Sequence, residues 1–367
     1  MYFLTPGYRI PAVQRGLSPV ETLLTKANAG LGGAVLMSAM ITPPPVWALG
    51  AVGAAAALLN VAPGPRSAAR WAAVGYRRLR ESTVPDSMVA QPGATATWAL
   101  YPDHGTMQDP LRRAAFHDAF SRALVFAGGQ ARTAGVQVHV THHATVGDCT
   151  VHTQTVSVHV PKALGRPERI LGTLKGEFAR LGALTPVETE PVPVVAERGP
   201  GWVGLDDGCY AATARVTAWP DATDGDLMPR LLLGDEQDRA LRNPLVATDR
   251  SFGVLYRPLT AAQSRRSAKW QSAAAGAFTT DEVKQTTHEI ASGTTHGALV
   301  AGATLVDLDA YMTVWGDSPA TVSEARWQAS LTADRHRVHL DWLAGQQHRA
   351  HVMTTPHGAS TRKGAIL

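Results

Sequence analysis

The stretches GVQVHVTH, at residues 135–142, and TVHTQTVSVHV, at residues 150–160, decide the fold of the larger part of this chain. Both alternate apolar and polar side chains with a period of two, which is typical of strands that bury one face. Gly147 and Asp148 lie between the two stretches and are residues that turns favour. The sequence therefore predicts an antiparallel hairpin here.

The elements around this hairpin predict an α+β fold with two ferredoxin-like modules. In the first module, residues 94–200, a strand at 95–102 and a helix at 110–127 precede the hairpin, and a helix at 166–181 and an edge strand at 186–195 follow it. Asp109 and Pro110 form an N-terminal cap for the earlier helix. This β-α-β-β-α-β order is that of a ferredoxin-like sandwich.

The second predicted module, residues 205–357, repeats this order around a helical insertion. Its strands are expected at 209–220, 249–259, 298–316 and 335–343, and its helices at 227–233 and 318–331, with the insertion at 260–294. Ser318 is the expected N-cap of the helix that it precedes. Residues 358–367 are expected to be a tail.

The N-terminal region, residues 1–82, has a long segment without charge. No Asp, Glu, Lys or Arg occurs between Lys26 and Arg66, and the middle of this segment holds three consecutive prolines, Pro43, Pro44 and Pro45. Consecutive prolines cannot continue a helix. The segment is also longer than the roughly 20 residues of one membrane-spanning helix. It predicts a transmembrane helical hairpin that turns at the prolines, followed by a basic juxtamembrane helix at 66–82.

The charge distribution sets the expected orientation. Residues 1–80 contain eight basic residues and one acidic residue, a net charge of about +7. The whole chain has a net charge of +4, so residues 81–367 carry about −3 (4 − 7). By the positive-inside rule, both termini and both α/β modules are expected in the cytoplasm, with the chain a multi-pass protein of the cell (inner) membrane. Because the basic residues flank an apolar segment, direct nucleic-acid binding is not expected. A second interpretation is a soluble binding protein in which the apolar segment is a buried helical pair.

The sequence lacks the common catalytic motifs, so no catalytic residue, cofactor or metal ligand is assigned. It contains no P-loop and no G-x-S-x-G elbow. Its two cysteines, Cys149 and Cys209, exclude a disulfide scaffold and a cysteine-rich zinc module. The one constellation of interest is formed by five histidines, which are His139, His142, His143, His152 and His159.

Two groups of polar residues leave alternatives open. The predicted hairpin would bring His142 and His152 together, which is compatible with a metal site, but polar positions on an exposed strand face are the favoured interpretation. Asp307 and Asp309 lie two residues apart and point to one face of a strand. Paired acids of this kind serve in hydrolases, and a solvated strand end is the other interpretation. A membrane-bound metal-dependent hydrolase is therefore one alternative function.

The second module resembles a known family in a series of short strings. These are YAATARVTAWP at 210–220, LMPRLLL at 227–233, the strand at 250–258, Arg265-Arg266, Tyr311-Met-Thr-Val and Leu343-Ala-Gly-Gln-Gln347. They resemble a membrane-anchored component of conjugation (type IV secretion) machines in high-GC Gram-positive mobile elements. The module is similar in turn to the non-catalytic N-terminal domain of conjugation ATPases. The resemblance covers about residues 205–357, whereas residues 94–200 carry no pattern of that family.

The resemblance implies a non-enzymatic structural subunit of a conjugative DNA-transfer or secretion apparatus. Such a subunit would anchor a cytoplasmic platform to the membrane, dock an ATPase on a separate chain, contact other secretion subunits and form a homo-oligomer. The implied docking candidates lie at the C-terminal end of the module, where the related ATPases continue into their catalytic domain. They are Trp342, Gly345, Gln346 and Gln347. A membrane component of type VII secretion is a further alternative.

Overall fold

The two alternating stretches form neighbouring strands at the centre of one half of a large sheet. Strand β2 (Gln137–Thr145) pairs antiparallel with β3 (Val151–Pro161). Gln137 lies opposite His159 and Thr145 lies opposite Val151. Val138, Val140, Val156 and Val158 face one side of the sheet and are buried there. The period of two therefore defines a buried apolar face, as the sequence predicts.

The structure is a computed structural model of the 367-residue chain. It describes residues 19–38, 46–60, 68–69, 71–72, 74–75, 92–106, 109–130, 135–146, 151–188, 193–220, 227–233, 248–278, 293, 295–297, 299–300 and 302–356. The predicted hairpin turn at Pro43, Pro44 and Pro45, most of the predicted basic helix at 66–82 and the predicted tail at 358–367 lie outside the described residues.

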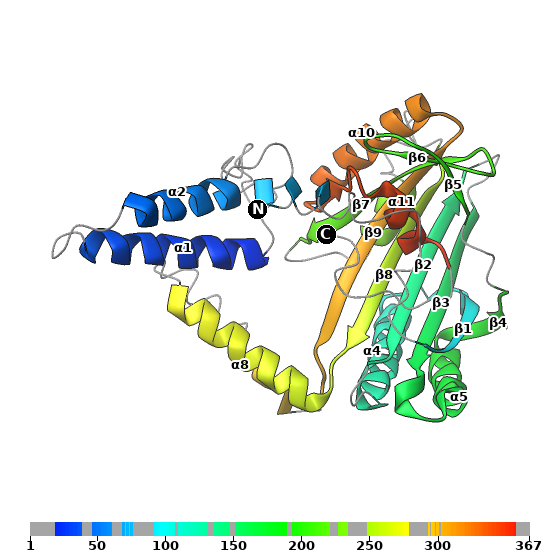
Figure 1. Cartoon of the computed structure of the whole chain (residues 1–367). Coiled ribbons are helices and arrows are strands. Elements are labelled where there is room, and N and C mark those ends of the chain that lie inside the picture. Colours follow the sequence, from blue (N-terminus) through cyan, green and yellow to red (C-terminus); the bar gives the residue numbers. More distant parts are fainter. Residues whose placement is uncertain are drawn as a thin grey trace.

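Ten antiparallel strands form one continuous sheet in the order β4-β1-β3-β2-β8-β9-β7-β6-β5, and β10 pairs with β7 (Figure 1). Besides β2 and β3, the strands are β1 (Gly93–Pro102), β4 (Gly182–Pro186), β5 (Val195–Arg198), β6 (Val203–Leu205), β7 (Tyr210–Ala218), β8 (Arg250–Pro258), β9 (Val306–Gly316) and β10 (His339–Trp342). The helices are α1 (Pro19–Ser38), α2 (Val46–Asn60), α4 (Pro110–Gln130), α5 (Pro167–Phe178), α6 (Leu227–Leu233), α8 (Ala261–Phe278), α10 (Pro319–Arg335) and α11 (Gln347–Ala350). Short 3₁₀ turns are η2 (Lys162–Leu164), η3 (Ala179–Leu181) and η5 (His351–Thr354).

The sheet has two halves that meet at the β2–β8 pair. Each half follows a β-α-β-β-α-β order along the chain, with strand orders β4-β1-β3-β2 and β8-β9-β7-β10. Val140 of β2 lies directly opposite Val254 of β8, so these side chains share one face. Val140 packs with α4 and α5, and Val254 packs with α6 and α10. The helices of both halves therefore cover the same face of the sheet.

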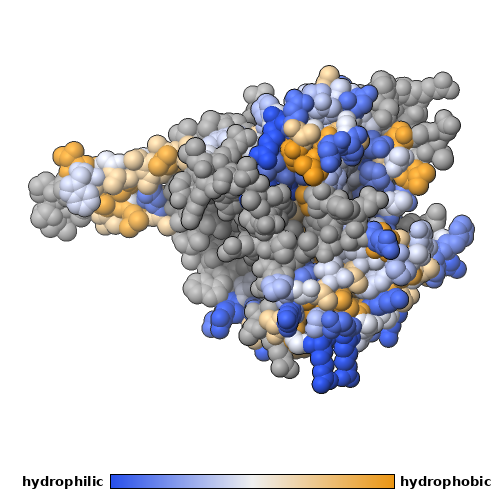
Figure 2. Space-filling view, turned by 45° about the vertical axis from the view of Figure 1, so that its right-hand side comes forward, coloured by the Kyte–Doolittle hydropathy of each residue, from blue (hydrophilic) through white to orange (hydrophobic). Residues whose placement is uncertain are grey.

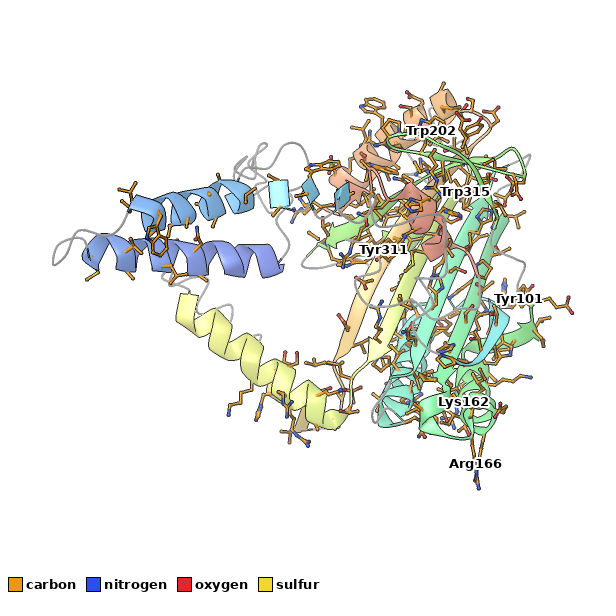
Figure 3. The ribbon with its side chains drawn as sticks, viewed as in Figure 1. Tyr101, Lys162, Arg166, Trp202, Tyr311 and Trp315 are labelled. Carbon is orange, nitrogen blue, oxygen red and sulfur yellow. The ribbon has the colours of Figure 1, made fainter. Side chains whose placement is uncertain are left out.

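Segment 343–354, which includes α11 and η5, lies on the opposite face. Its residues Leu343, Val352 and Met353 form a small apolar cluster with Leu255 of β8 and Tyr311 of β9 (Figure 3). Much of this face is built from Thr, Ser and His side chains that are buried and hydrogen-bonded. For example, Thr97 of β1 bonds Ser157 of β3 at 2.9 Å between the two hydroxyl oxygens. This arrangement satisfies polar groups that would otherwise be costly to bury.

Helices α1 and α2 pack on each other and stand away from the sheet, and the arm that they form carries apolar residues at the left of Figure 2. Helix α2 has 15 residues and spans about 22 Å, less than the roughly 30 Å hydrocarbon core of a bilayer. Helix α1 has 20 residues, but Glu21 and Lys26 fall in its first half.

Among the described residues, no helix is both long enough and apolar enough to cross a membrane. This finding overturns two predictions from the sequence, the transmembrane hairpin and the multi-pass location in the cell membrane. The absence of charge between Lys26 and Arg66 was misleading because a charge-free segment need not form a helix long enough to span a bilayer. The many glycines and alanines of this segment also make it only moderately apolar. The fold is α+β with one large antiparallel sheet.

Candidate interaction surface

The five histidines of the predicted constellation are divided between the two faces of the sheet. His142 lies opposite Phe252 and His152 lies opposite Ala144, so both are on the helix-covered face. There His142 Nδ1 is 3.2 Å from His152 Nε2. The predicted approach of these two histidines is therefore confirmed.

The other three histidines are on the opposite face, each with its own partner. His139 Nε2 donates to the Met353 carbonyl at 2.9 Å, and His159 Nδ1 is 2.8 Å from the Thr95 hydroxyl. His143 bonds Ser251. Within the part of the chain that the structure describes, no group of three or more His, Cys, Asp or Glu side chains could hold a metal ion.

Asp309 is the centre of an ion-pair network with two arginines. Its carboxylate binds Arg215 of β7 and, at 2.6 Å, Arg257 of β8. Burial alone would raise the pKa of Asp309, but the two guanidinium charges and their hydrogen bonds outweigh it and hold the pKa below its ordinary value. A general acid needs a raised pKa. The geometry of Asp309 therefore does not favour the hydrolase alternative.

Ser251 and His143 form a contact that the sequence analysis missed. The Ser251 hydroxyl accepts a hydrogen bond from Trp315 Nε1 at 2.8 Å and lies 2.6 Å from His143 Nδ1. A serine beside a histidine suggests a nucleophile and its base. However, Ser251 is only 1% exposed, in a central strand. Burial also lowers the pKa of His143. This contact links β2, β8 and β9, and a substrate cannot reach the hydroxyl.

The predicted docking residues surround the point where the chain leaves β10. Gly345 has a φ of +80°, which favours glycine, and its N–H donates to the Pro200 carbonyl at 3.1 Å. Gln346 and Gln347 are buried. The side-chain amide of Gln347 binds both backbone groups of Thr213, at 2.7 and 2.9 Å. These three residues shape the turn beneath the surface, and their role in docking stays a prediction.

Trp342 is the member of this set that reaches the surface. Its Nε1 donates to the Ser330 hydroxyl of α10 at 2.9 Å. The guanidinium of Arg326 lies over its ring, 5.0 Å from the centroid. Such a cation–π contact contributes roughly 0.5–2 kcal/mol. The indole is therefore held in one orientation, half-buried at the edge of the second half of the sheet.

Helix α10 extends this surface with an exposed tryptophan. The residues of α10 that pack against the sheet include Val322, Ala325, Ala329 and Ala333. Trp327 falls on the other side of the helix and is 57% exposed, with Leu331 one turn later. Trp327 precedes Ser330, which bonds Trp342, by three residues and precedes Leu331 by four, so these side chains are neighbours on the helix surface. We define the α10–β10 surface as Arg326, Trp327, Ser330, Leu331 and Trp342.

The sequence analysis did not single out Trp327, although the spacing of the small apolar residues in α10 contained the signal. A tryptophan out of phase with the buried positions of a helix points to solvent.

Comparison of the sequence with protein-family models finds no matching family, and comparison with curated proteins finds no match.

Proposed function

We propose that this chain is a non-enzymatic structural subunit of a conjugative DNA-transfer or secretion apparatus, and that it docks a separate ATPase through the α10–β10 surface. Two things support this. The strings in residues 205–357 resemble the non-catalytic domain of conjugation ATPases, and the same part of the chain presents an exposed tryptophan on the helix that fixes a second one. Membrane anchorage is not part of the proposed function, because α1 and α2 lack the required length and apolar character.

The observation that carries the proposal is the exposure of Trp327 on the helix whose Arg326 and Ser330 contact Trp342. Single exposed apolar residues are common on soluble proteins and need no explanation. Here two tryptophans, an arginine and Leu331 are contiguous. Tryptophan and arginine are the residues that most often dominate the free energy of protein–protein binding. The packing that fixes Trp342 also lowers the entropic cost of binding.

The position of this surface fits the proposed partner. β10 is the last strand of the second half of the sheet, and the chain turns away from it at Gly345. In the ATPases that this module resembles, the corresponding point leads into the catalytic domain. A system in which the two parts are separate chains would keep that contact as a non-covalent interface. The alternative of a metal-dependent hydrolase gains no support from the dispersed histidines or from the ion-paired Asp309.

Co-purification from the native host tests this proposal. The epitope-tagged full chain should enrich an ATPase that contains a P-loop, identified by mass spectrometry. Trp327→Ala should reduce its recovery at least tenfold, as expected for a residue worth about 2 kcal/mol in binding. The matched control is Trp219→Ala. Trp219 is 39% exposed and its ring contacts Phe252, outside the α10–β10 surface.

Two outcomes would contradict the proposal. One is equal recovery of the ATPase with Trp327→Ala and with the unaltered chain. The other is robust ATP turnover by the pure chain alone. Deletion of residues 345–367 is not a suitable test, because Gln347 and Met353 bind the sheet and their loss would disturb the fold.

A further inference from the structure

His142 and His152 lie side by side on adjacent strands at the end of the β2–β3 hairpin. His142 Nδ1 and His152 Nε2 are 3.2 Å apart. Their rings are parallel to within 2°, with centroids 5.3 Å apart. His142 is opposite Gln154 and His152 is opposite Ala144, so the two histidines are diagonal neighbours on one face. The pairing of two strands therefore fixes the positions of two imidazole nitrogens relative to each other.

The distance between these nitrogens matches that between two ligands of one metal ion. Zinc binds histidine nitrogen at about 2.0–2.1 Å with tetrahedral geometry. Two such nitrogens are then separated by roughly 3.3–3.4 Å. Imidazole nitrogen also suits copper and nickel, whereas magnesium and calcium prefer oxygen.

His152 is exposed, so an ion can reach the pair from solvent. Neutral imidazole nitrogen is the form of histidine that binds metal ions.

We propose that His142 and His152 together bind one zinc ion, or a similar divalent transition-metal ion, with water in the remaining coordination positions. Within the described residues, no third His, Cys, Asp or Glu side chain completes a metal-binding group. The site is therefore open and exchangeable, unlike a closed structural site with four protein ligands. His143 takes no part, because it faces the other side of the sheet and bonds Ser251. This inference is independent of the proposed docking function.

Calorimetric titration of the chelator-treated full chain with zinc chloride tests the site. We expect one ion per chain in the unaltered protein. Each of His142→Gln and His152→Gln should weaken binding at least tenfold, since each removes one of two protein ligands. The matched control is His104→Gln, which alters an exposed histidine in the turn after β1 and should leave binding unchanged. Magnesium chloride should show no binding to the pair.

A second measurement does not depend on the variants folding. In the unaltered chain, zinc should shift the ring ¹⁵N resonances of His142 and His152, with the ring signal of His104 unchanged. Cobalt(II) should give visible absorption bands that zinc then removes. The proposal is overturned if zinc shifts other histidines and leaves this pair unchanged, or if the double variant with both glutamines binds zinc like the unaltered chain.

Discussion

The side-chain amide of Gln347 is hydrogen-bonded to both backbone groups of Thr213. Gln347 Oε1 accepts from the Thr213 N–H at 2.7 Å, and Gln347 Nε2 donates to the Thr213 carbonyl at 2.9 Å. Thr213 lies on β7 between the residues that pair with β6 and those that pair with β10. The Gln347 side chain of α11 thus supplies the acceptor for the Thr213 N–H at this gap in the ladder, and it shares the Thr213 carbonyl with the Leu343 N–H.

Replacing Gln347 should destabilise the fold. Gln347→Ala leaves the buried N–H of Thr213 without this acceptor, which costs about 1–3 kcal/mol, whereas the Thr213 carbonyl keeps the hydrogen bond from the Leu343 N–H. Gln347→Glu keeps the shape but removes the donor and brings an oxygen to the Thr213 carbonyl, so an equal or larger loss is expected. Urea unfolding measures both. Gln130→Ala, at the end of α4, is the control and should change the free energy of unfolding by less than about 0.5 kcal/mol. Equal stability of Gln347→Ala and the control would contradict this role.

Gly253 of β8 should not tolerate a side chain. A Cβ atom at this position would lie 2.0 Å from the Met353 carbonyl oxygen, which belongs to the segment that covers the sheet. Gly253→Ala must therefore displace that segment, and we expect a loss of about 1–3 kcal/mol or more in thermal unfolding. Gly172→Ala in α5 is the contrasting change, because no atom lies within 4 Å of its Cβ position. It should stabilise the chain by roughly 0.5–1 kcal/mol. A neutral Gly253→Ala would show that segment 343–354 is not packed closely on β8.

The Asp309 network predicts a dependence of stability on pH. The folded pKa of Asp309 is lowered, so the folded state binds this proton less readily than the unfolded state, where the pKa is about 3.9. Its contribution is therefore fully present above that unfolded pKa and is lost as the pH falls through the folded pKa. At pH 6, Asp309→Asn should cost about 2–4 kcal/mol, because two partly buried arginines lose their counter-charge. Below about pH 4 the difference from the unaltered chain should shrink.

Urea unfolding between pH 6 and pH 2.5 checks this prediction. The control is Asp307→Asn, two residues away on the same strand, which should cost less than about 1 kcal/mol. A constant difference between Asp309→Asn and the unaltered chain at all pH values would show that the ionised carboxylate is not what stabilises the network.

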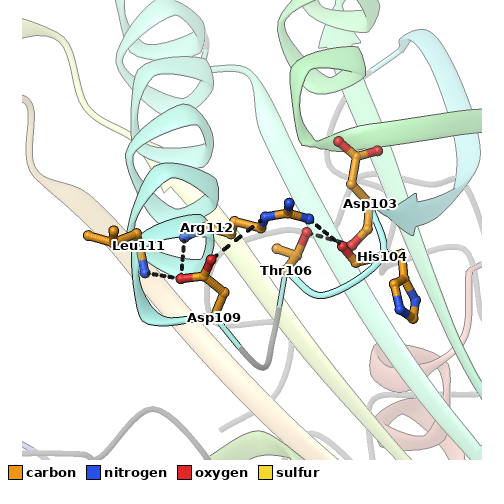
Figure 4. A network of polar contacts seen from close by, with 6 residues as sticks. All are labelled: Asp103, His104, Thr106, Asp109, Leu111 and Arg112. Carbon is orange, nitrogen blue, oxygen red and sulfur yellow. Dashed lines mark hydrogen bonds and ion pairs between the residues drawn. The ribbon is translucent and has the colours of Figure 1, made fainter.

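The cap of α4 predicts a smaller effect. Asp109 Oδ1 accepts from the Leu111 N–H at 2.8 Å, and the carboxylate lies 3.7 Å from Arg112 (Figure 4). Asp109→Ala should cost about 1 kcal/mol in thermal unfolding. Asp109→Asn keeps the accepting oxygen and should cost less than about 0.5 kcal/mol, because the exposed ion pair with Arg112 contributes little. If both variants lose the same free energy, the charge and not the cap is what matters.

Local patterns in the sequence predicted much of the sheet and its helix ends. The period of two placed β2 and β3 and brought His142 to His152. The caps at Asp109 and Ser318 were also predicted, and the Ser318 hydroxyl accepts from the Thr321 N–H at 3.2 Å. These features depend on residues that are close in the chain, so short patterns determine them.

The errors arose where the cause is distant or depends on length. The helix was expected at 110–127, but α4 continues through Gly128 and Gly129 to Gln130. A Cβ at Gly128 would lie 2.8 Å from the Leu259 carbonyl, so this glycine allows close packing on the sheet. The burial of Gln347 depends on Thr213, which is 134 residues away. The membrane hairpin was predicted from a long charge-free segment broken by prolines, but neither α1 nor α2 is both long enough and apolar enough to cross a membrane.

The hydrogen bond from His139 to the Met353 carbonyl joins residues that are 214 positions apart. While the ribosome is still building the chain, the first half of the sheet emerges before its partner on this face exists. A nascent chain can pair β2 with β3 locally, but it cannot complete the polar face until residue 353 has been made. Topologies with such distant contacts fold slowly and leave unpaired strands exposed for longer. This protein should therefore reach its native state after translation, with β2 open at the edge that β8 later covers, and in that interval it should be a good client for chaperones.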